Sequence, residues 1–339
     1  MLRRLGGLMP RAQQSPRYAW IEENRCARRD SFAQAVDDGL GSEPRSLPCR
    51  FFYDAAGSRL FEAICELPEY YLTRAEHEIL TRHADAIIER CPTPVTLAEL
   101  GSGSSTKTRM LIEALLRAQG RLRYVPVDIS RSMLDEAAQA LLADYRGLEI
   151  TAIASEYRDG LRHLGKETRL PKLIAWLGSN IGNFSRGEAH HFVGGIRDAM
   201  GADDRLLLGV DLRKDARVLV SAYDDAQGVT ARFNKNLLAR INGELGGQFD
   251  LADWSHRARV VDDGGRVELG LVCRRACEVH VAALDRSFRF DRGDFIHTED
   301  STKYSEPEVA SLADAASLRV EERWLDSDRR FCVALLAPH

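Results

Sequence analysis

Short apolar runs alternate with amphipathic stretches through the middle of this chain, and this alternation limits its fold more than any other feature. Between the runs, apolar residues recur at helical spacing, as Met110, Leu111, Ala114 and Leu115 do. Buried strands that alternate with helices predict a parallel sheet covered by helices on both faces. The expected strands lie at residues 95–100, 124–127, 150–154, 173–177 and 206–210.

The alternation stops near residue 214, where a different pattern begins. Residues 229–245 have helical spacing, and the strand-like segment 267–273 then follows a turn sequence at residues 262–265. This order predicts an antiparallel insert. The α/β pattern resumes at Ser305, and the chain closes on two strands, at residues 320–325 and 331–336.

Two serines carry signals for the start of a helix. Ser185 precedes Glu188 by three positions, and Ser305 precedes Glu308 by the same spacing, which is the pattern of a capping box. The neighbouring acids Asp224 and Asp225 resemble acid–base machinery or a metal site. Their place just before the helix expected at residues 229–245 explains them more simply, because carboxylates stabilise a helix N-terminus.

The composition argues against several classes of partner. With 339 residues, 44% of them hydrophobic and 29% charged, the chain fits a soluble enzyme of two compact units. A net charge of −4 gives no electrostatic reason to expect nucleic acid or an anionic membrane as partner. No apolar run approaches the ~20 residues that span a bilayer, and the basic N-terminus lacks the apolar segment of a secretory signal. We therefore expect a cytoplasmic protein.

The seven cysteines are odd in number and lack the spacing of a zinc site. Cys273 and Cys277 lie four positions apart in a strand-like run, so both are expected to face the same way and to pack. We expect seven reduced thiols and no metal.

Polar residues follow the first three expected strands, at the edge where open α/β sheets bind ligands. Gly101 and Gly103 follow the first strand, where glycines let the backbone approach a ligand closely. The third glycine of a dinucleotide fingerprint is missing from the segment 104–106, which disfavours a nicotinamide cofactor. Asp128 ends the second strand, where its carboxylate could accept two ribose hydroxyls.

Three more residues extend this pattern. Glu156 and Tyr157 end the third strand, where they could contact the edge and the face of an adenine ring. Lys107 follows the glycine turn and is either a solvated helix lysine or a partner for a ligand carboxylate. Together with Gly101 and Asp128, these residues predict a site for S-adenosylmethionine, with Lys107 on the methionine carboxylate.

Longer segments are more specific than these single positions. They are Phe51-Phe52-Tyr53-Asp54, Leu67-Pro68-Glu69-Tyr70-Tyr71, Glu99-Leu100-Gly101-Ser102-Gly103, Leu177-Gly178-Ser179-Asn180-Ile181-Gly182-Asn183, Ala222-Tyr223-Asp224-Asp225 and Phe233-Asn234. From about residue 46 onward the chain resembles the L-histidine Nα-methyltransferases of ergothioneine biosynthesis. That family methylates the histidine α-amine three times and gives the betaine hercynine.

The resemblance implies a Rossmann-like class I methyltransferase sheet with an inserted α+β substrate-binding domain. Residues 76–213 with 304–339 would form the S-adenosylmethionine-binding domain. Residues 21–75 with 214–303 would form the amino-acid substrate domain, and residues 1–20 a flexible tail. A monomer is expected.

The resemblance also implies which residues hold the backbone of the amino acid. Tyr70 would contact it, Asn183 and Tyr223 would clamp the α-carboxylate, and Tyr53 would line the amine pocket as the catalytic tyrosine. Hydroxyl and amide donors bind a carboxylate without a cation that would repel the sulfonium. Aromatic faces also tolerate the quaternary ammonium product.

Glu299 and Ser301 would recognise the imidazole, because a carboxylate accepts one ring N–H and a hydroxyl can serve the other nitrogen. Two positions depart from the family. Leu269 replaces a methionine near the imidazole, an exchange of similar volume. Asn180 replaces a threonine next to the amine.

Three alternatives stay open. A relative could act on another amino acid such as a tryptophan derivative, but an indole offers only one N–H donor to Glu299 and Ser301. A nicotinamide-dependent reductase lacks support because the third glycine is missing. A non-catalytic S-adenosylmethionine-binding protein would have no need of a carboxylate clamp.

Overall fold

The computed structural model describes residues 17–22, 25–167, 170–262 and 265–339. Its main sheet has eight strands in the order β1-β4-β3-β2-β5-β6-β13-β12. Neighbours from β1 to β6 are parallel, whereas β13 runs antiparallel to both β6 and β12. The strands are β1 (Tyr18–Glu22), β2 (Thr96–Leu100), β3 (Leu122–Asp128), β4 (Leu148–Ala154), β5 (Lys172–Trp176), β6 (Arg205–Asp211), β12 (Leu318–Leu325) and β13 (Phe331–Pro338). The expected parallel strands and the closing hairpin are confirmed.

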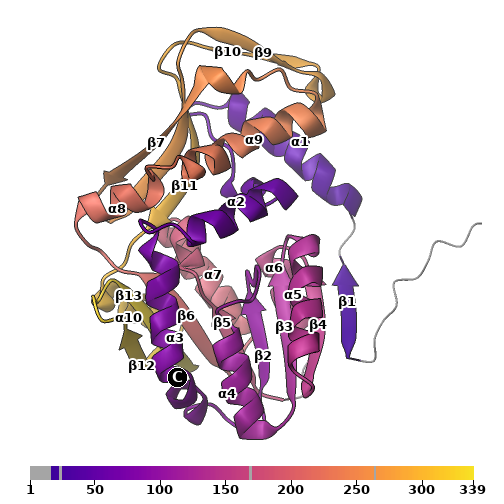
Figure 1. Ribbon diagram of the computed structural model, residues 1–339, viewed down its shortest axis with the longest axis vertical. Helices are drawn as coiled ribbons and strands as arrows, with labels where there is room; N and C mark the ends of the chain where they lie inside the picture. The colour runs from indigo at the N-terminus through magenta and orange to yellow at the C-terminus, as the bar shows by residue number, and fades with distance from the viewer. Residues whose placement is uncertain (1–16, 23–24, 168–169, 263–264) are drawn as a thin grey trace, which may run out of the picture.

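Helices cover both faces of this sheet (Figure 1). Consecutive strand residues enter different cores, as Leu97 and Ala98 do, because side chains alternate across a strand. One core is closed by α3 (Tyr71–Glu89), α4 (Arg109–Gln119) and α5 (Arg131–Asp144). The other is closed by α6 (Tyr157–Glu167), α7 (Arg186–Asp198) and α10 (Glu306–Ala315). Both predicted capping boxes are present, Ser185–Glu188 at α7 and Ser305–Glu308 at α10.

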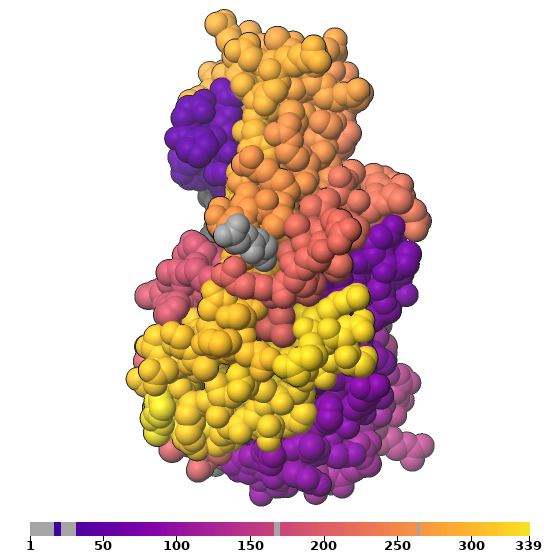
Figure 2. All heavy atoms as spheres, turned by 90° about the vertical axis from the view of Figure 1, so that its left-hand side faces the viewer, coloured from indigo at the N-terminus to yellow at the C-terminus, as the bar shows by residue number. Residues whose placement is uncertain are grey.

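The chain between β6 and α10 forms an insert with two small antiparallel sheets, as predicted. It contains α8 (Ala216–Tyr223), α9 (Val229–Leu245), β7 (Trp254–Val261), β8 (Arg266–Cys273), β9 (Cys277–Val281), β10 (Arg286–Phe290) and β11 (Phe295–Thr302), with short 3-10 helices at Leu251–Asp253 and Ala282–Leu284. The helix α9 has the predicted bounds. Figure 2 shows the insert, in orange, stacked above the C-terminal residues, in yellow.

Segments before the main sheet join this insert. They are α1 (Arg25–Gly41), the 3-10 helix η1 (Cys49–Phe52) and α2 (Ala55–Cys65). Both α2 and η1 pack against α9, and Phe52 of η1 lies 4.5 Å from Phe233 between ring centroids, with the two rings tilted. In Figure 1 the α2 helix lies between the insert and the sheet. The segment between β1 and α3, together with the insert, therefore covers the carboxyl ends of the strands.

Two boundary predictions and one prediction about cysteines differ from the structure. The expected tail at residues 1–20 ends earlier, because Tyr18–Glu22 pair with β4 as an edge strand; residues 1–16 lie outside the described chain. The expected division between residues 75 and 76 falls inside the continuous helix α3, which packs against α4 and β13.

The third correction concerns two cysteines. Cys273 ends β8 and Cys277 begins β9, so they do not share a strand, although their sulfurs lie 3.8 Å apart across the turn. Both are free thiols, as are the four other cysteines whose side chains are described. Among the described helices, none has both the length and the apolar character needed to cross a bilayer.

Candidate active site

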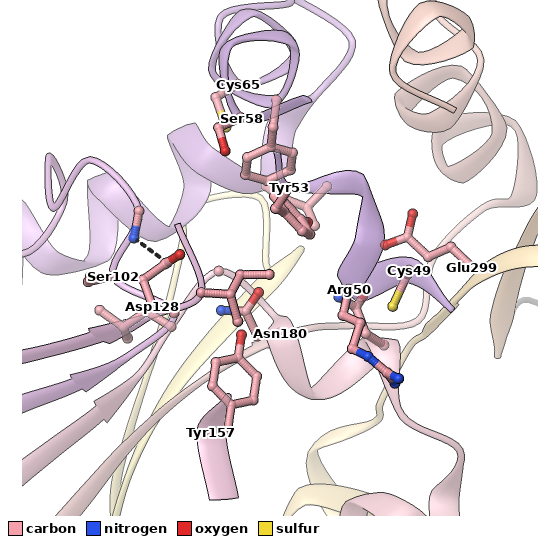
Figure 3. A pocket seen from close by; sticks show the side chains of 18 of the residues that line it. Cys49, Arg50, Tyr53, Ser58, Cys65, Ser102, Asp128, Tyr157, Asn180 and Glu299 are labelled. Carbon is pink, nitrogen blue, oxygen red and sulfur yellow. Dashed lines mark hydrogen bonds between the residues drawn. The ribbon is translucent and has the colours of Figure 1, made fainter. Parts of the chain in front are cut away.

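A cavity of about 920 Å³ opens at the carboxyl ends of β2, β3 and β4 and reaches under η1 and α2. It is lined by every residue predicted to bind the cofactor: Gly101, Lys107, Asp128, Glu156 and Tyr157. A second cavity of about 30 Å³ adjoins it and shares part of its lining, including Tyr53 and Asn180. This smaller cavity is lined by all six residues predicted for the amino acid: Tyr53, Tyr70, Asn183, Tyr223, Glu299 and Ser301. Figure 3 shows Asp128 and Glu299 on opposite sides of the space.

The turn after β2 forms one wall. Gly101 and Gly103 adopt φ values of +73° and +50°, where glycine is favoured. A Cβ atom on Gly101 would lie 2.6 Å from the Tyr157 hydroxyl oxygen and 2.7 Å from Asn180 Nδ2. Glycine at position 101 is therefore required by the side chains of Tyr157 and Asn180, which meet there (Figure 3).

Asp128 is held in place by the backbone. Its Oδ2 accepts the Gly103 N–H at 2.9 Å, and its Oδ1 accepts the Ser130 N–H at 2.8 Å. Carboxylate oxygens accept more than one hydrogen bond each, so hydroxyls can be added from the cavity. Ser102, also in the lining, has a buried Oγ with no partner among the described residues. This donor set fits the ribose of the expected cofactor.

The adenine end is more exposed. Glu156 forms an ion pair with Arg50 at 3.3 Å across the cavity mouth, and its side chain is 58% exposed. Tyr157 packs edge-on against Trp176, and burial raises the pKa of its phenol. Tyr157 is thus a neutral aromatic wall, whereas Glu156 is partly engaged by another side chain.

Lys107 has a partner within the protein. Its ammonium donates to Glu76, a fully buried carboxylate whose two oxygens also accept the Gly178 N–H at 2.8 and 3.0 Å. Burial opposes the charge of Lys107, but Glu76 outweighs it and the lysine pKa is raised. Lys107 lines the cavity, yet it neutralises a protein carboxylate that the sequence did not mark as its partner.

Glu99 is a site residue that the sequence reasoning missed. It lies buried at the end of β2 and accepts hydrogen bonds from Thr108 Oγ1, at 2.6 Å, and from the Tyr124 hydroxyl. Burial raises the pKa of Glu99 to about 7 against the opposing effect of these two donors. Glu99 could have been recognised in the sequence because it is a carboxylate within the apolar run 95–100.

Aromatic rings enclose the amine end. Tyr53 packs edge-on against Phe61 at 5.6 Å and Phe233 at 5.7 Å, and Tyr70 packs against Tyr223 at 6.1 Å. Burial raises the pKa of both Tyr53 and Tyr70 well above the usual value. Their phenols are therefore neutral and serve to position a group, not to ionise. Asn180 and Leu269, the two departures, lie in the lining of the smaller cavity.

Glu299 lies on β11 and faces Tyr53 and Cys49. Burial raises the pKa of Glu299 to about 7, although the nearby Lys303 and His297 lower it. Its carboxyl group therefore exchanges a proton near neutral pH and can either donate or accept a hydrogen bond.

Tyr223 and Ser301 lie together, with 2.7 Å between their hydroxyl oxygens. Lys303 Nζ lies behind them, 2.8 Å from each oxygen, and its side chain is fully buried. A buried ammonium therefore lies behind the hydroxyl of the expected carboxylate clamp. The sequence signal was a lysine two positions after Ser301.

The acidic pair before α9 caps that helix. Asp225 accepts the Val229 N–H at 2.9 Å and the Thr230 N–H at 2.7 Å, which lowers its pKa against the effect of burial. The simpler interpretation of this pair is thus confirmed for Asp225. Within the described parts of the chain, no three His, Cys, Asp or Glu side chains are grouped in a way that could hold a metal ion.

Comparison with known proteins agrees with this geometry. Residues 32–338 match the family model of the histidine-specific, SAM-dependent methyltransferases. The chain is 42% identical to a histidine N-alpha-methyltransferase from Mycolicibacterium smegmatis, over 90% of this chain and 96% of the relative. It is 35% identical to ergothioneine biosynthesis protein 1 from Neurospora crassa, over 83% of this chain and 32% of that protein. Among solved structures, a magnesium protoporphyrin IX methyltransferase from Synechocystis with bound SAH aligns with a TM-score of 0.45 at 11% identity, over 86% of this chain and 98% of that one.

Proposed function

This chain belongs to the family of histidine-specific, S-adenosylmethionine-dependent methyltransferases, and we propose that it methylates the α-amino group of L-histidine. Three successive transfers would give hercynine, and its formation would be the first step of ergothioneine biosynthesis. The observation that carries the proposal is the smaller cavity: it is lined by all six residues expected to bind the amino acid, and it adjoins the larger cavity, which the glycine turn and Asp128 line.

Asp128, Ser102 and the glycine turn would hold the ribose side of the cofactor, with Tyr157 against the adenine. When bound, S-adenosylmethionine supplies an electrophilic methyl group on its sulfonium. The remaining contribution of the protein is alignment and exclusion of water, because direct displacement needs the two reacting atoms in line. The apolar rings of Phe61 and Phe233 and the roof formed by α2 supply the dry wall.

The amine must be neutral to attack, although an α-amino group has a pKa of about 8 or above. Desolvation between Tyr53 and Tyr70 would favour the neutral form. With the pKa of Tyr53 raised, this phenol places the amine and does not act as a phenolate base. The released proton would leave through water. The same aromatic faces would accommodate the methylated cation.

Tyr70 would contact the amino-acid backbone, and Asn183 and Tyr223 would bind the α-carboxylate. Glu299 and Ser301 would recognise the imidazole. This last pair favours histidine over the alternative of a tryptophan derivative, because an indole has no second ring nitrogen for them to bind.

The test is a methyl-transfer assay of the purified protein with each of the twenty amino acids, read by mass spectrometry. Histidine should be the preferred acceptor, and products carrying one, two and three methyl groups should appear in order. Transfer to tryptophan with histidine inert would replace the proposal by its alternative. Absence of transfer to any amino acid, with cofactor binding intact, would favour a binding protein.

We further propose that the enzyme works as a monomer in the cytoplasm. The described residues of a single chain line both cavities, and the described cysteines are free thiols. Light scattering of the active enzyme should give the mass of one chain.

We also propose that residues 214–303, with the segment before α3, close over the sheet when both ligands bind. X-ray scattering should detect this closure as a smaller radius of gyration.

A further inference from the structure

Lys303, the buried lysine behind Tyr223, has no role in the proposed function. Its three N–H donors are all engaged: with Tyr223 at 2.8 Å, with Ser301 at 2.8 Å, and with Asp211 Oδ2 at 2.7 Å. Lys303 is absent from the lining of both cavities, whereas Tyr223 and Ser301 line the smaller one. The lysine therefore reaches a ligand only through these two hydroxyls.

Counting protons defines what the hydroxyl pair can offer. Each hydroxyl has one proton, and each oxygen already accepts a hydrogen bond from Lys303. Neither proton can point back toward the ammonium, so one proton joins the two oxygens across their 2.7 Å contact. The other proton points forward, into the cavity. The pair thus presents one donor and one acceptor to a ligand.

We propose that Lys303 is a positioning residue that orients this pair, so that Tyr223 donates to the α-carboxylate of the amino acid while Ser301 accepts an N–H from its side chain. The proposal rests on the proposed function, because it assumes that an amino acid binds where the larger cavity meets the smaller one, against Tyr223 and Ser301. It deepens that function by linking recognition of the carboxylate to recognition of the side chain. A ring nitrogen without a proton would meet the lone pair of Ser301.

Without Lys303 the arrangement changes. Asp211 is a buried carboxylate on the same side of the pair, and it would attract the hydroxyl protons backward. Lone pairs would then face the cavity and repel a carboxylate. Removing the lysine should therefore weaken binding of the carboxylate in particular, beyond any effect of charge.

The structure supplies a matched control for charge. Lys214 also pairs with Asp211, and it donates to the Tyr71 hydroxyl at 2.7 Å, so it lies on the far side of the same carboxylate. Lys303→Met and Lys214→Met each remove one positive charge and each leave Asp211 with one lysine. Only Lys303→Met removes the donors to Tyr223 and Ser301.

The experiment compares binding of histidine and of histidinol, which lacks the carboxylate, by calorimetry in the presence of S-adenosylhomocysteine. The ratio of the two affinities measures carboxylate recognition. Lys303→Met should lower this ratio about 10- to 100-fold, the loss expected for a hydrogen bond to a charged group. Lys214→Met should change it less than about threefold, and both variants should bind histidinol and the cofactor as wild type does. KM for histidine should rise in Lys303→Met with kcat little changed.

Equal ratios in the two lysine variants would overturn the proposal, because charge alone would then explain the effect. If Lys303→Met does not fold, Ser301→Ala decides: it leaves Lys303 as the internal partner of Tyr223, so the ratio should stay at the wild-type value. A lower ratio of histidine to histidinol affinity in Ser301→Ala would show that Ser301 orients the Tyr223 hydroxyl, and would refute the role of Lys303. If another amino acid proves to be the substrate, the same ratio is measured with that amino acid and its amino alcohol, so failure of the proposed function is seen separately.

Discussion

The ammonium of Lys107 donates to the carboxylate of Glu76, 31 positions away, and this carboxylate also accepts the Gly178 N–H. One buried acid thus ties α3 to the segment after β2 and to the turn after β5. All three segments border the larger cavity. The pair is therefore part of the framework on which the cavity is built.

This pairing predicts a loss of stability when Lys107 is replaced. Lys107→Met leaves Glu76 charged and buried without its partner, which should lower the free energy of unfolding by about 3–5 kcal/mol. The double replacement Glu76→Gln with Lys107→Met should restore most of the lost free energy of unfolding. Denaturant unfolding of the three variants provides the measurement. An unchanged stability with weaker cofactor binding would instead support the role on the methionine carboxylate.

Asp128→Ala should weaken binding of S-adenosylmethionine by about 1.5–3 kcal/mol, the range for hydrogen bonds to a charged group. Glu156→Ala is the matched acid at the neighbouring strand end. Glu156→Ala should weaken cofactor binding less than Asp128→Ala does, because Glu156 is more than half exposed and already paired with Arg50. Calorimetry on the folded variants measures both affinities. Unchanged binding in Asp128→Ala removes this residue from the site.

Glu299→Ala should remove most of the preference for histidine, because an imidazole N–H loses its partner. The transition-state stabilisation calculated from kcat/KM for histidine should fall by about 2–5 kcal/mol. It should also narrow the gap to tryptophan and phenylalanine, since the charge that disfavours apolar rings is gone. Asn183→Ala should reduce activity on every amino acid alike. Values of kcat/KM for the three amino acids in both variants test this, and a histidine preference that survives Glu299→Ala contradicts it.

The pKa of Glu299 near 7 predicts a pH-dependent effect on stability. The folded-state pKa exceeds the unfolded value, so the contribution of Glu299 to stability is fully present below about pH 4.5 and is lost as pH rises through 7. Glu299→Gln does not titrate, so without ligand it should gain about 3 kcal/mol over wild type above pH 7 and little at pH 4. Thermal unfolding at several pH values measures the difference. A gain that is constant with pH would show that Glu299 is not responsible.

Local patterns in the sequence were sufficient for most of the fold. Apolar runs such as 206–210 are buried strands because no polar residue interrupts them, and Ser185 with Glu188 caps a helix through contacts within four residues. The helix Val229–Leu245 starts at its acidic cap and ends at Gly246, so both ends were marked. Short-range signals of this kind do not depend on the rest of the chain.

Long-range pairings could not be predicted in this way. The partners Glu76 and Lys107 sit on separate elements, and Lys303 meets Asp211 only because the chain leaves the sheet at β6 and returns after β11. The edge strand Tyr18–Glu22 was missed because five residues are too few for a clear periodicity. The cofactor residues could be grouped because they follow successive strands of one sheet, whereas the amino-acid-binding residues were grouped by family resemblance alone, since their spacing gives no such grouping.

The strand β1 has a consequence for handling the protein. It pairs with β4 over five residues, from Tyr18 opposite Ile150 to Glu22 opposite Ala154. Without it, β4 would become the margin of the sheet, and its unpaired backbone groups would lie beside an apolar run. Such margins template edge-to-edge aggregation. A shortened form that begins after Glu22 would therefore be prone to insolubility even with both cavities intact, and an N-terminal fusion partner should be joined well ahead of Tyr18.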